Sequence, residues 1–288
     1  MKYLFDEITD RRPDNYGPYL TACENSKGVL DVDTVKGCEL GMQAYPNGGC
    51  YGECYAAKTA KMYGYDFTKS VSRKPYKLHF ANVFDAVKNF YATWYRIGTA
   101  GDPSHDWDNT VDVCVKLIPT GKTPVIITKH WIAASDKHLI ALKDCGASFN
   151  TSTSGFDTDQ EIEYRVAQIK RIASFGIKSI NRIVTAKYGN TEWGMMAQKK
   201  QDYLFTIQPV IDNPLRIPTT SERVKNGDVI VEKVQRAIGG GKMVSLHTKG
   251  IYLGHCSLCP DQCGAVNGAR IEQEKQIEPE DLFATVNA

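Results

Sequence analysis

Pro124-Val125-Ile126-Ile127-Thr128-Lys129 is rich in β-branched residues and predicts a buried strand. A short helix is expected over residues 137–143, and a second strand follows over 147–153. The best amphipathic helix of the chain is predicted over 160–175, and another strand over 180–186. Strands that alternate with helices at this spacing are typical of βα units around a parallel sheet.

The alternation continues on both sides of this stretch. Further elements are predicted as strands over 28–35, 94–99 and 203–210, and as helices over 55–62, 78–93 and 111–118. About six strands then follow one another, which predicts an α/β fold with a partial (β/α)6 TIM-like barrel of parallel strands. A doubly wound open sheet is the alternative arrangement of the same elements. Residues 1–238 are assigned to this domain, and residues 239–288, which begin with three glycines, to a small C-terminal cysteine-rich extension.

The composition is that of an ordinary soluble globular protein. Hydrophobic residues make up 42% and charged residues 24% of the 288 residues, and the formal net charge is +2. So small a net charge gives no support for a strongly electrostatic nucleic-acid interface. The N-terminus lacks the apolar core of a secretory signal, and no apolar run approaches the roughly 18 residues of a membrane helix. We therefore expect a cytoplasmic protein with no membrane partner.

The cysteines are the most informative residues for function. Six of the nine fall into two groups of three, namely Cys38, Cys50 and Cys54, and Cys256, Cys259 and Cys263. Disulfides are uncommon in the cytoplasm, so clustered cysteines there more often bind metal or react. Three thiolates are one fewer than a closed tetrahedral zinc site or a fully ligated iron–sulfur cluster requires. The count therefore suggests a metal with an open coordination position.

The first triplet lies where a cluster-binding loop is expected. Cys38 follows the predicted strand 28–35, and Cys50 and Cys54 precede the predicted helix 55–62. Glycines between these cysteines give the loop the freedom to wrap an inorganic core. The start of a helix also favours the negative charge of a thiolate.

A three-cysteine loop after the first strand of a βα repeat resembles the radical S-adenosylmethionine (radical SAM) superfamily. Cys54-Tyr55-Ala56 is also similar to a group of phage-encoded proteins of this type. The family pattern is Cys-x3-Cys-x2-Cys with an aromatic residue before the last cysteine. Here eleven residues separate Cys38 from Cys50, three separate Cys50 from Cys54, and Glu53 takes the place of the aromatic residue.

The resemblance implies a [4Fe–4S] cluster bound by Cys38, Cys50 and Cys54. The free iron would chelate SAM, and reductive cleavage of SAM would yield a 5′-deoxyadenosyl radical that abstracts hydrogen from a substrate. A low-potential electron donor such as flavodoxin or ferredoxin is implied as a partner. The substrate class stays open between a small molecule, a nucleotide and a peptide, and no catalytic residue is assigned.

The resemblance also implies residues that contact SAM. Gly101 and Asp102 resemble the last two positions of the family's Gly-Gly-Glu segment. Polar residues on the following strands stand where family members contact the carboxylate and ribose, namely Lys129, Asn150, Ser152 and Thr185. Alternatively, Asp102 begins a strand-to-helix turn, and the other polar residues satisfy backbone groups at strand ends.

The second triplet, in a Gly/Pro/Asp loop, predicts either an auxiliary [4Fe–4S] cluster or a structural zinc ion. Radical SAM enzymes with an auxiliary cluster carry it in such a C-terminal extension. A fourth ligand could be Cys23, His247 or His255, or the position could be open to substrate. A single site that joins all six cysteines is a further alternative.

Two histidines have two interpretations each. His105 lies among Asp102, Asp106 and Asp108, which fits either a metal or acid–base site or the solvated start of a helix. His130, at the end of a predicted strand, either lines the active site or is packed in the core.

The sequence thus predicts a radical SAM enzyme. The alternatives are a structural zinc-binding protein, with or without nucleic-acid binding, and an iron–sulfur enzyme that does not use SAM. The chain has no P-loop, His-Glu-x-x-His or Gly-x-Gly-x-x-Gly motif, which argues against phosphoryl transfer, zincin chemistry and Rossmann cofactors.

Overall fold

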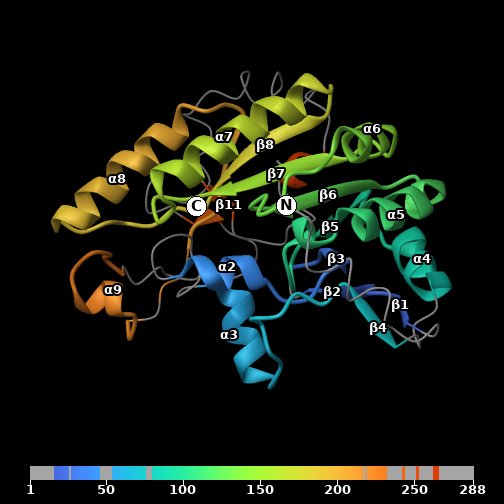
Figure 1. Cartoon of the computed structure of the whole chain (residues 1–288), viewed down its shortest axis with the longest axis horizontal. Coiled ribbons are helices and arrows are strands. Elements are labelled where there is room, and N and C mark those ends of the chain that lie inside the picture. Colours follow the sequence, from blue (N-terminus) through green and yellow to red (C-terminus); the bar gives the residue numbers. More distant parts are fainter. Residues whose placement is uncertain are drawn as a thin grey trace, which may run out of the picture.

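The computed structural model describes residues 16–25, 27–45, 54–75, 80–215, 217, 219–231, 242–243, 251–252 and 262–265. These residues form a seven-stranded sheet in the order β2-β3-β5-β6-β7-β8-β9 (Figure 1). Neighbouring strands are parallel except β2 and β3, which are antiparallel. The strands are β2 (Thr21–Glu24), β3 (Leu30–Asp33), β5 (Trp94–Ile97), β6 (Thr123–Thr128), β7 (Ser148–Thr153), β8 (Lys178–Ile183) and β9 (Val210–Asp212).

Helices cover one face of this sheet, which we call the outer face. Tyr95, Ile126 and Phe149 of the strands pack there with Val113 and Leu139 of the helices, and this cluster is the main core. The covering helices are α4 (Phe80–Asn89), α5 (Trp107–Leu117), α6 (Asp136–Asp144), α7 (Asp159–Ser174) and α8 (Glu192–Phe205).

The opposite face, which we call the inner face, is more polar. Register places Arg96 of β5 beside Val125 of β6 on this face, and Asn150 of β7 beside Ile180 of β8. Side chains alternate between the two faces of a strand, so these residues point away from the covering helices. This is the surface on which a ligand of the sheet could lie.

Shorter elements complete the fold. They are β1 (Tyr16–Pro18), α2 (Glu39–Ala44), α3 (Tyr55–Met62), β4 (Arg73–Pro75), η2 (Pro103–His105), η3 (Ile118–Thr120), α9 (Glu222–Lys225), β10 (Lys242–Met243), β11 (Ile251–Tyr252) and η5 (Gln262–Gly264). β1 pairs with β4, and β10 with β11, in antiparallel ladders. No helix among the described residues is both long and apolar enough to cross a membrane.

The predicted α/β class with a parallel sheet is confirmed. The expected strands correspond to β3 and β5 to β9, with β2 added as an antiparallel edge. The sheet is open, because its edges β2 and β9 do not pair with one another in the described part of the chain.

The strand predicted over 203–210 is wrong for most of its length. α8 continues to Phe205, and β9 spans only Val210–Asp212. Leu204 is completely buried as part of the apolar stripe of α8, while Pro209 has no N–H group for a strand ladder. A short apolar run fits a buried helix end as well as a strand, and periodicity alone does not separate the two. α2, α8 and β2 were not predicted.

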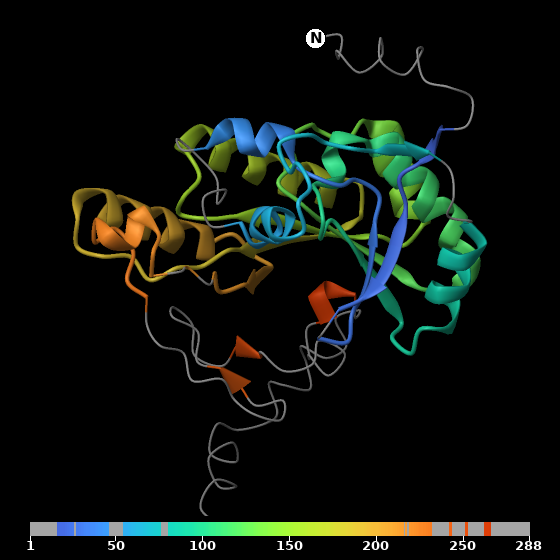
Figure 2. The same cartoon turned by 90° about the horizontal axis from the view of Figure 1, so that it is seen from below.

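The predicted C-terminal extension is described only in part. The boundary at residue 238 and most of 239–288 lie outside the described residues. η5 contacts β7 of the sheet, and it lies on the side of the sheet opposite α5 and α6 (Figure 2). Residues 262–265 of this extension therefore pack on the sheet rather than standing apart from it.

Truncation of a core residue tests the position of the core. Leu139 of α6 is completely buried, whereas its neighbour Ile140 is 54% exposed. We expect Leu139→Ala to lower the free energy of unfolding by about 2–5 kcal/mol, because it leaves a cavity, and Ile140→Ala to change it by less than about 0.5 kcal/mol. Urea denaturation followed by circular dichroism measures both. Equal losses in the two variants would contradict this packing.

Candidate metal centre

Two glycines hold Cys38 at the carboxyl end of β5. Gly37 and Gly101 form a parallel bridge, and the Gly37 N–H donates to the carbonyl of Ala100 at 2.9 Å. A Cβ atom on Gly101 would lie 2.5 Å from the carbonyl oxygen of Val35 and 2.6 Å from that of Gly37. Because these contacts are with backbone atoms, no side chain fits at position 101. The predicted SAM contact Gly101 therefore lies directly against the segment that leads into Cys38.

The backbone around Cys38 is fixed from a second side. Gly37 has a left-handed φ of +85°, and a Cβ there would lie 2.0 Å from the carbonyl oxygen of Lys69. The Cys38 N–H donates to the carbonyl of Phe67 at 3.0 Å, and Cys38 then begins α2. The Cys38 side chain is buried. Its position is thus set by backbone contacts with two separate segments of the chain.

Cys54 begins α3 and lies close to Cys38. The hydroxyl of Tyr55 donates to the carbonyl of Thr99 at 2.9 Å, which ties the start of α3 to the loop that also carries Gly101. Cys38 and Cys54 belong to one apolar cluster with Ala56 and Ala60 of α3. The structure thus brings together the two described cysteines of the first triplet.

Cys50, the third cysteine of this triplet, lies outside the described residues. Within the described part of the chain, no group of three His, Cys, Asp or Glu side chains is arranged to hold a metal ion. The two thiols of Cys38 and Cys54 are the described part of the predicted cluster site.

His105 lies beside the first triplet, on η2. Its Nε2 is 3.5 Å from the sulfur of Cys38. Burial lowers the pKa of His105 below its ordinary value, although the charges of Asp102 and Glu39 act in the opposite direction. A neutral imidazole beside a thiol can donate a hydrogen bond to a thiolate or bind a metal itself. Asp102 and Asp106 cap η2 and α5, as the helix-start interpretation expected, and the contact of His105 with Cys38 was in neither interpretation.

Both carboxylate oxygens of Asp102 accept hydrogen bonds from neighbouring residues of the chain. Oδ1 accepts from the hydroxyl of Thr128 at 2.6 Å and from the N–H and hydroxyl of Ser104 at 2.9 and 2.7 Å. Oδ2 accepts from the N–H of Lys129 at 2.7 Å. Asp102 therefore starts η2 and ties it to the end of β6, as the turn interpretation expected.

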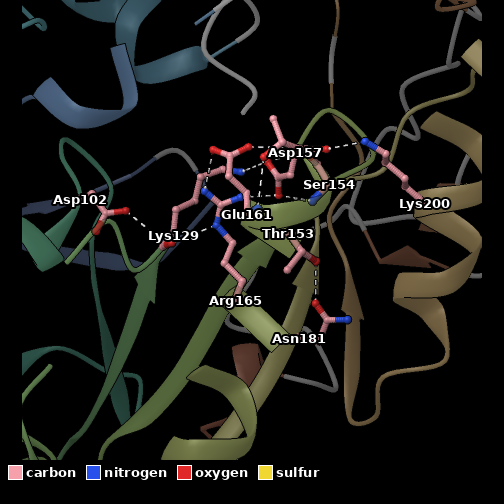
Figure 3. Close-up of polar contacts among 10 residues, drawn as sticks. Asp102, Lys129, Thr153, Ser154, Asp157, Glu161, Arg165, Asn181 and Lys200 are labelled. Carbon is pink, nitrogen blue, oxygen red and sulfur yellow. Dashed lines mark hydrogen bonds and ion pairs between the residues drawn. The ribbon is translucent and has the colours of Figure 1, made fainter. Parts of the chain in front are cut away.

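The predicted SAM contact Lys129 is the first member of a buried ion-pair network (Figure 3). Its Nζ lies 2.7 Å from Asp157 Oδ1, and Arg165 Nη1 lies 2.8 Å from Asp157 Oδ2. Arg165 also donates through Nε to the carbonyl of Lys129 at 3.0 Å and pairs with Glu161 at 3.3 Å. Burial alone would raise the pKa of Asp157, but the charges of Arg165 and Lys129 outweigh it and hold that pKa below its ordinary value. The Lys129 ammonium is thus already neutralised by Asp157.

The other predicted SAM contacts lie apart from Cys38. Thr185 is buried and donates to Asp212 Oδ1 at 2.5 Å. Ser152 is opposite Arg182 in the β7–β8 register, on the inner face. Asn150 is completely buried in the middle of β7, and its Nδ2 donates to the carbonyl of Cys263 at 2.9 Å. Asn150 therefore contacts the second triplet rather than the first.

The second triplet is represented by Cys263. This residue packs with Val29, Trp94 and Val125, where Trp94 is the first residue of β5. Cys38 lies beyond the opposite end of the same strand, so the described members of the two triplets occupy different ends of the sheet. Cys256, Cys259 and the possible ligands His247 and His255 lie outside the described residues, and Cys23 is exposed on β2.

Two acidic residues near the site were not singled out from the sequence. Asp33 Oδ1 accepts from the N–H groups of Thr99 and Ala100 at 2.7 and 3.0 Å. Burial raises the pKa of Asp33 to about 6, although these hydrogen bonds act to lower it. Asp31, two residues earlier, forms a bidentate pair with Arg96 at 2.7 and 3.1 Å. The alternation Leu30-Asp31-Val32-Asp33 was the available signal, since it places both carboxylates on the inner face of the strand.

His130 is a core residue. It is completely buried, its ring stacks on Phe149 with centroids 5.9 Å apart, and its Nε2 lies 2.9 Å from the hydroxyl oxygen of Thr151. Burial lowers the pKa of His130 to about 4. Of its two interpretations, packing in the core is the correct one.

Comparison with protein-family models gives no match, and no curated protein is significantly similar to the chain.

Removal of the central anion tests the buried network. Asp157→Ala leaves the buried charges of Lys129 and Arg165 without the carboxylate that joins them. We expect a loss of about 3–5 kcal/mol in the free energy of unfolding. Asp159→Ala is the matched control, because Asp159 pairs with Lys200 at 2.9 Å but its side chain is 78% exposed, and we expect a loss of about 0–1 kcal/mol. Urea denaturation measures both, and similar losses would count against the network.

The pKa of Asp33 predicts a pH-dependent stability. Folding raises this pKa from an ordinary value of about 4 to about 6, so the ionised carboxylate costs stability above pH 6, and the cost disappears as the pH falls to about 4. Asp33→Asn should therefore be more stable than the parent by roughly 1–3 kcal/mol at neutral pH, with a gain that shrinks toward acid pH.

Urea unfolding across this pH range measures the effect. Asp66→Asn is a control of opposite sign, because hydrogen bonds from Thr68 lower the pKa of Asp66 and its stabilising effect is lost as the pH falls. A gain in Asp33→Asn that does not vary with pH would refute the assignment.

Proposed function

We propose that the chain is a radical SAM enzyme in which Cys38, Cys50 and Cys54 bind a [4Fe–4S] cluster. One observation carries the proposal: two helices that begin at cysteines are both tied to the loop after β5, one through Gly37 and Gly101 and the other through Tyr55 and Thr99. Ligands of parallel α/β sheets bind at the carboxyl ends of the strands, which is where this loop lies.

The described residues fit such a cluster. Thiolates are the usual ligands of iron–sulfur clusters. Cys38 and Cys54 pack against the same group of apolar side chains. Helix α3 begins at Cys54 and favours a negative charge there. His105, 3.5 Å from the sulfur of Cys38, is placed to donate a hydrogen bond to a thiolate, which would influence the reduction potential of the cluster.

The inner face of the open sheet is the proposed chamber for SAM and substrate. We interpret the sheet as a partial barrel, whose inner face carries the half-buried side chains of Arg96, Ile127 and Arg182. Gly101 and Ser152 are the residues that we propose as SAM contacts. Asp102, Lys129 and Thr185 would act by holding the strand ends in place, because their side chains are bound within the protein.

The bound cluster would supply the electron that cleaves SAM, so that the resulting radical abstracts hydrogen from a substrate that is a small molecule, a nucleotide or a peptide. A donor such as flavodoxin or ferredoxin would reduce the cluster. The protein's own part is to position both molecules on the inner face and to exclude water.

The distance between His105 and Cys38 also supports a second candidate function. His105 with Cys38, Cys50 and Cys54 would make a Cys3His set, which binds structural zinc. In that case the chain is a zinc protein without radical chemistry. Metal analysis and colour separate the two candidates, because iron–sulfur proteins are brown and zinc proteins are colourless.

The test is the release of 5′-deoxyadenosine from SAM by anaerobically reconstituted protein with dithionite. We expect release by the parent chain and none above background by Cys50→Ala, which lacks a cluster ligand. Cys145→Ala is the matched control, because Cys145 packs against the main core on the outer face, and it should release as much as the parent.

Each other outcome opposes the proposal. Zinc without iron in the purified protein would favour the Cys3His alternative. A full iron–sulfur complement without release would indicate an iron–sulfur enzyme that does not use SAM. Full release by Cys50→Ala would remove Cys50 from the cluster.

A further inference from the structure

Arg182 of β8 is a half-buried arginine on the inner face of the sheet. Register places it directly opposite Ser152 of β7 and Ile211 of β9. It is the last residue but one of β8, so it lies near the carboxyl end of that strand. Ligands of parallel α/β sheets bind at this edge. The guanidinium group of Arg182 is therefore placed where a molecule on the inner face can reach it.

No carboxylate neutralises Arg182 within the described part of the chain. Its Nη2 donates to Oδ1 of Asn213 at 2.8 Å, and this bond leaves most of the N–H donors of the guanidinium unused. Arg96 on β5 differs, because the bidentate pair with Asp31 satisfies it. A half-buried guanidinium without a counter-ion is a binding group for an anion, since its charge is only partly solvated.

Asn213 fixes the position of this guanidinium. Its N–H donates to the carbonyl of Ile183 at 2.8 Å, and its carbonyl accepts from the N–H of Thr185 at 3.2 Å. The backbone pairing of β8 with β9 thus continues through Asn213. While Oδ1 of Asn213 accepts from Arg182, the Nδ2 group of the same amide is a second donor beside the guanidinium. Both donors are positioned before a ligand arrives, which lowers the entropy cost of binding.

The charge at this place matches a carboxylate. A guanidinium carries a single positive charge, and its planar fork donates two parallel hydrogen bonds to the oxygens of a carboxylate. A phosphate group carries about 1.5 to 2 negative charges near neutral pH, so a single guanidinium would leave part of that charge without compensation. Lys129, at the end of β6, does not supply the missing charge, because Asp157 already neutralises it.

This place is separate from the part of SAM that the cluster would bind. That part is proposed to lie at Gly101 after β5, and β8 is three strands further along the sheet. Neighbouring strands are about 4.8 Å apart, so Arg182 lies roughly 14 Å away along the sheet. Ser152, the other proposed SAM contact, is directly opposite Arg182. A molecule held by Arg182 would therefore lie beside bound SAM, where a substrate has to lie.

We propose that Arg182 and Asn213 bind a carboxylate group of the substrate on the inner face of the sheet. The substrate is then a carboxylic acid or a peptide with a free carboxylate rather than a nucleotide. This inference deepens the proposed function and rests on it for the role of the ligand as a substrate. The binding of a carboxylate itself is measured without SAM and without a cluster.

The first experiment titrates the full-length chain with acetate at constant ionic strength and follows binding by saturation-transfer NMR. We expect saturable binding by the parent chain, with an affinity lower by about 10–100-fold in Arg182→Gln, which loses a charged donor. Asn213→Ala should also bind more weakly. Arg171→Gln is the matched control, because Arg171 lies on α7 and already pairs with Asp136, and it should bind acetate as the parent does.

Three results of this titration would overturn the proposal. One is the absence of saturable acetate binding by the parent chain, and another is an equal loss of affinity in Arg182→Gln and Arg171→Gln. The third is inorganic phosphate that binds more tightly than acetate and depends on Arg182, which would assign the site to a phosphate group. SAM is titrated in parallel, and a loss of SAM affinity in Arg182→Gln as large as the loss for acetate would assign Arg182 to SAM instead.

Chemical modification of arginine requires no variant. In the parent chain, acetate should slow the reaction of Arg182 with phenylglyoxal, while chloride at the same ionic strength should not, as peptide mapping reports. An equal rate in acetate and chloride would overturn the proposal even if Arg182→Gln failed to fold. Acetate bound at Arg182 without release of 5′-deoxyadenosine would reject the radical function and leave the carboxylate site. Release without acetate binding would reject only the site.

Discussion

The backbone of Gly101 lies against the carbonyl groups of Val35 and Gly37, with no room for a side chain, and the arrangement of the cysteine site depends on that contact. It fixes where the chain leaves β3 and therefore where Cys38 begins α2. The same loop receives the hydroxyl of Tyr55, so α3 and Cys54 are placed relative to it as well. A single short loop thereby sets the positions of two thiols that are sixteen residues apart in the sequence.

Buried carboxylates join the segments that follow β5, β6 and β7 at their carboxyl ends. Asp102 binds the end of β6, and Asp157 joins Lys129 to Arg165 between β6 and α7. These groups are buried, so each is stable only with its partners present. The network ties the end of β6 to α7 beside the proposed chamber.

The sequence predicted the βα order of this fold because its signals are local. β-branched runs indicated β6 and β7, and Thr158 with Glu161 at the start of α7 forms the capping box that ends the preceding loop. The error at 203–210 arose where a local signal is ambiguous, since Leu204 fits a buried strand as well as the apolar side of a helix. The contact of His105 with Cys38 and the pairing of Lys129 with Asp157 could not be predicted, because each joins side chains from separate elements. The two cysteine triplets could be read from the sequence. The location of Cys38 and Cys263 at opposite ends of the sheet could not.

The hydrogen bond between Asn150 and Cys263 spans 113 residues of sequence, and this separation orders events during folding. The last cysteine segment has no surface to bind until β5, β7 and β8 have paired, because its contacts are with Trp94, Ser148 and Ile180 from three different strands. Contacts of such long range form late, after local elements have paid the entropy of closing the chain. Residues 262–265 thus find their place only in a chain whose sheet is complete, so their burial reports correct assembly of β5, β7 and β8.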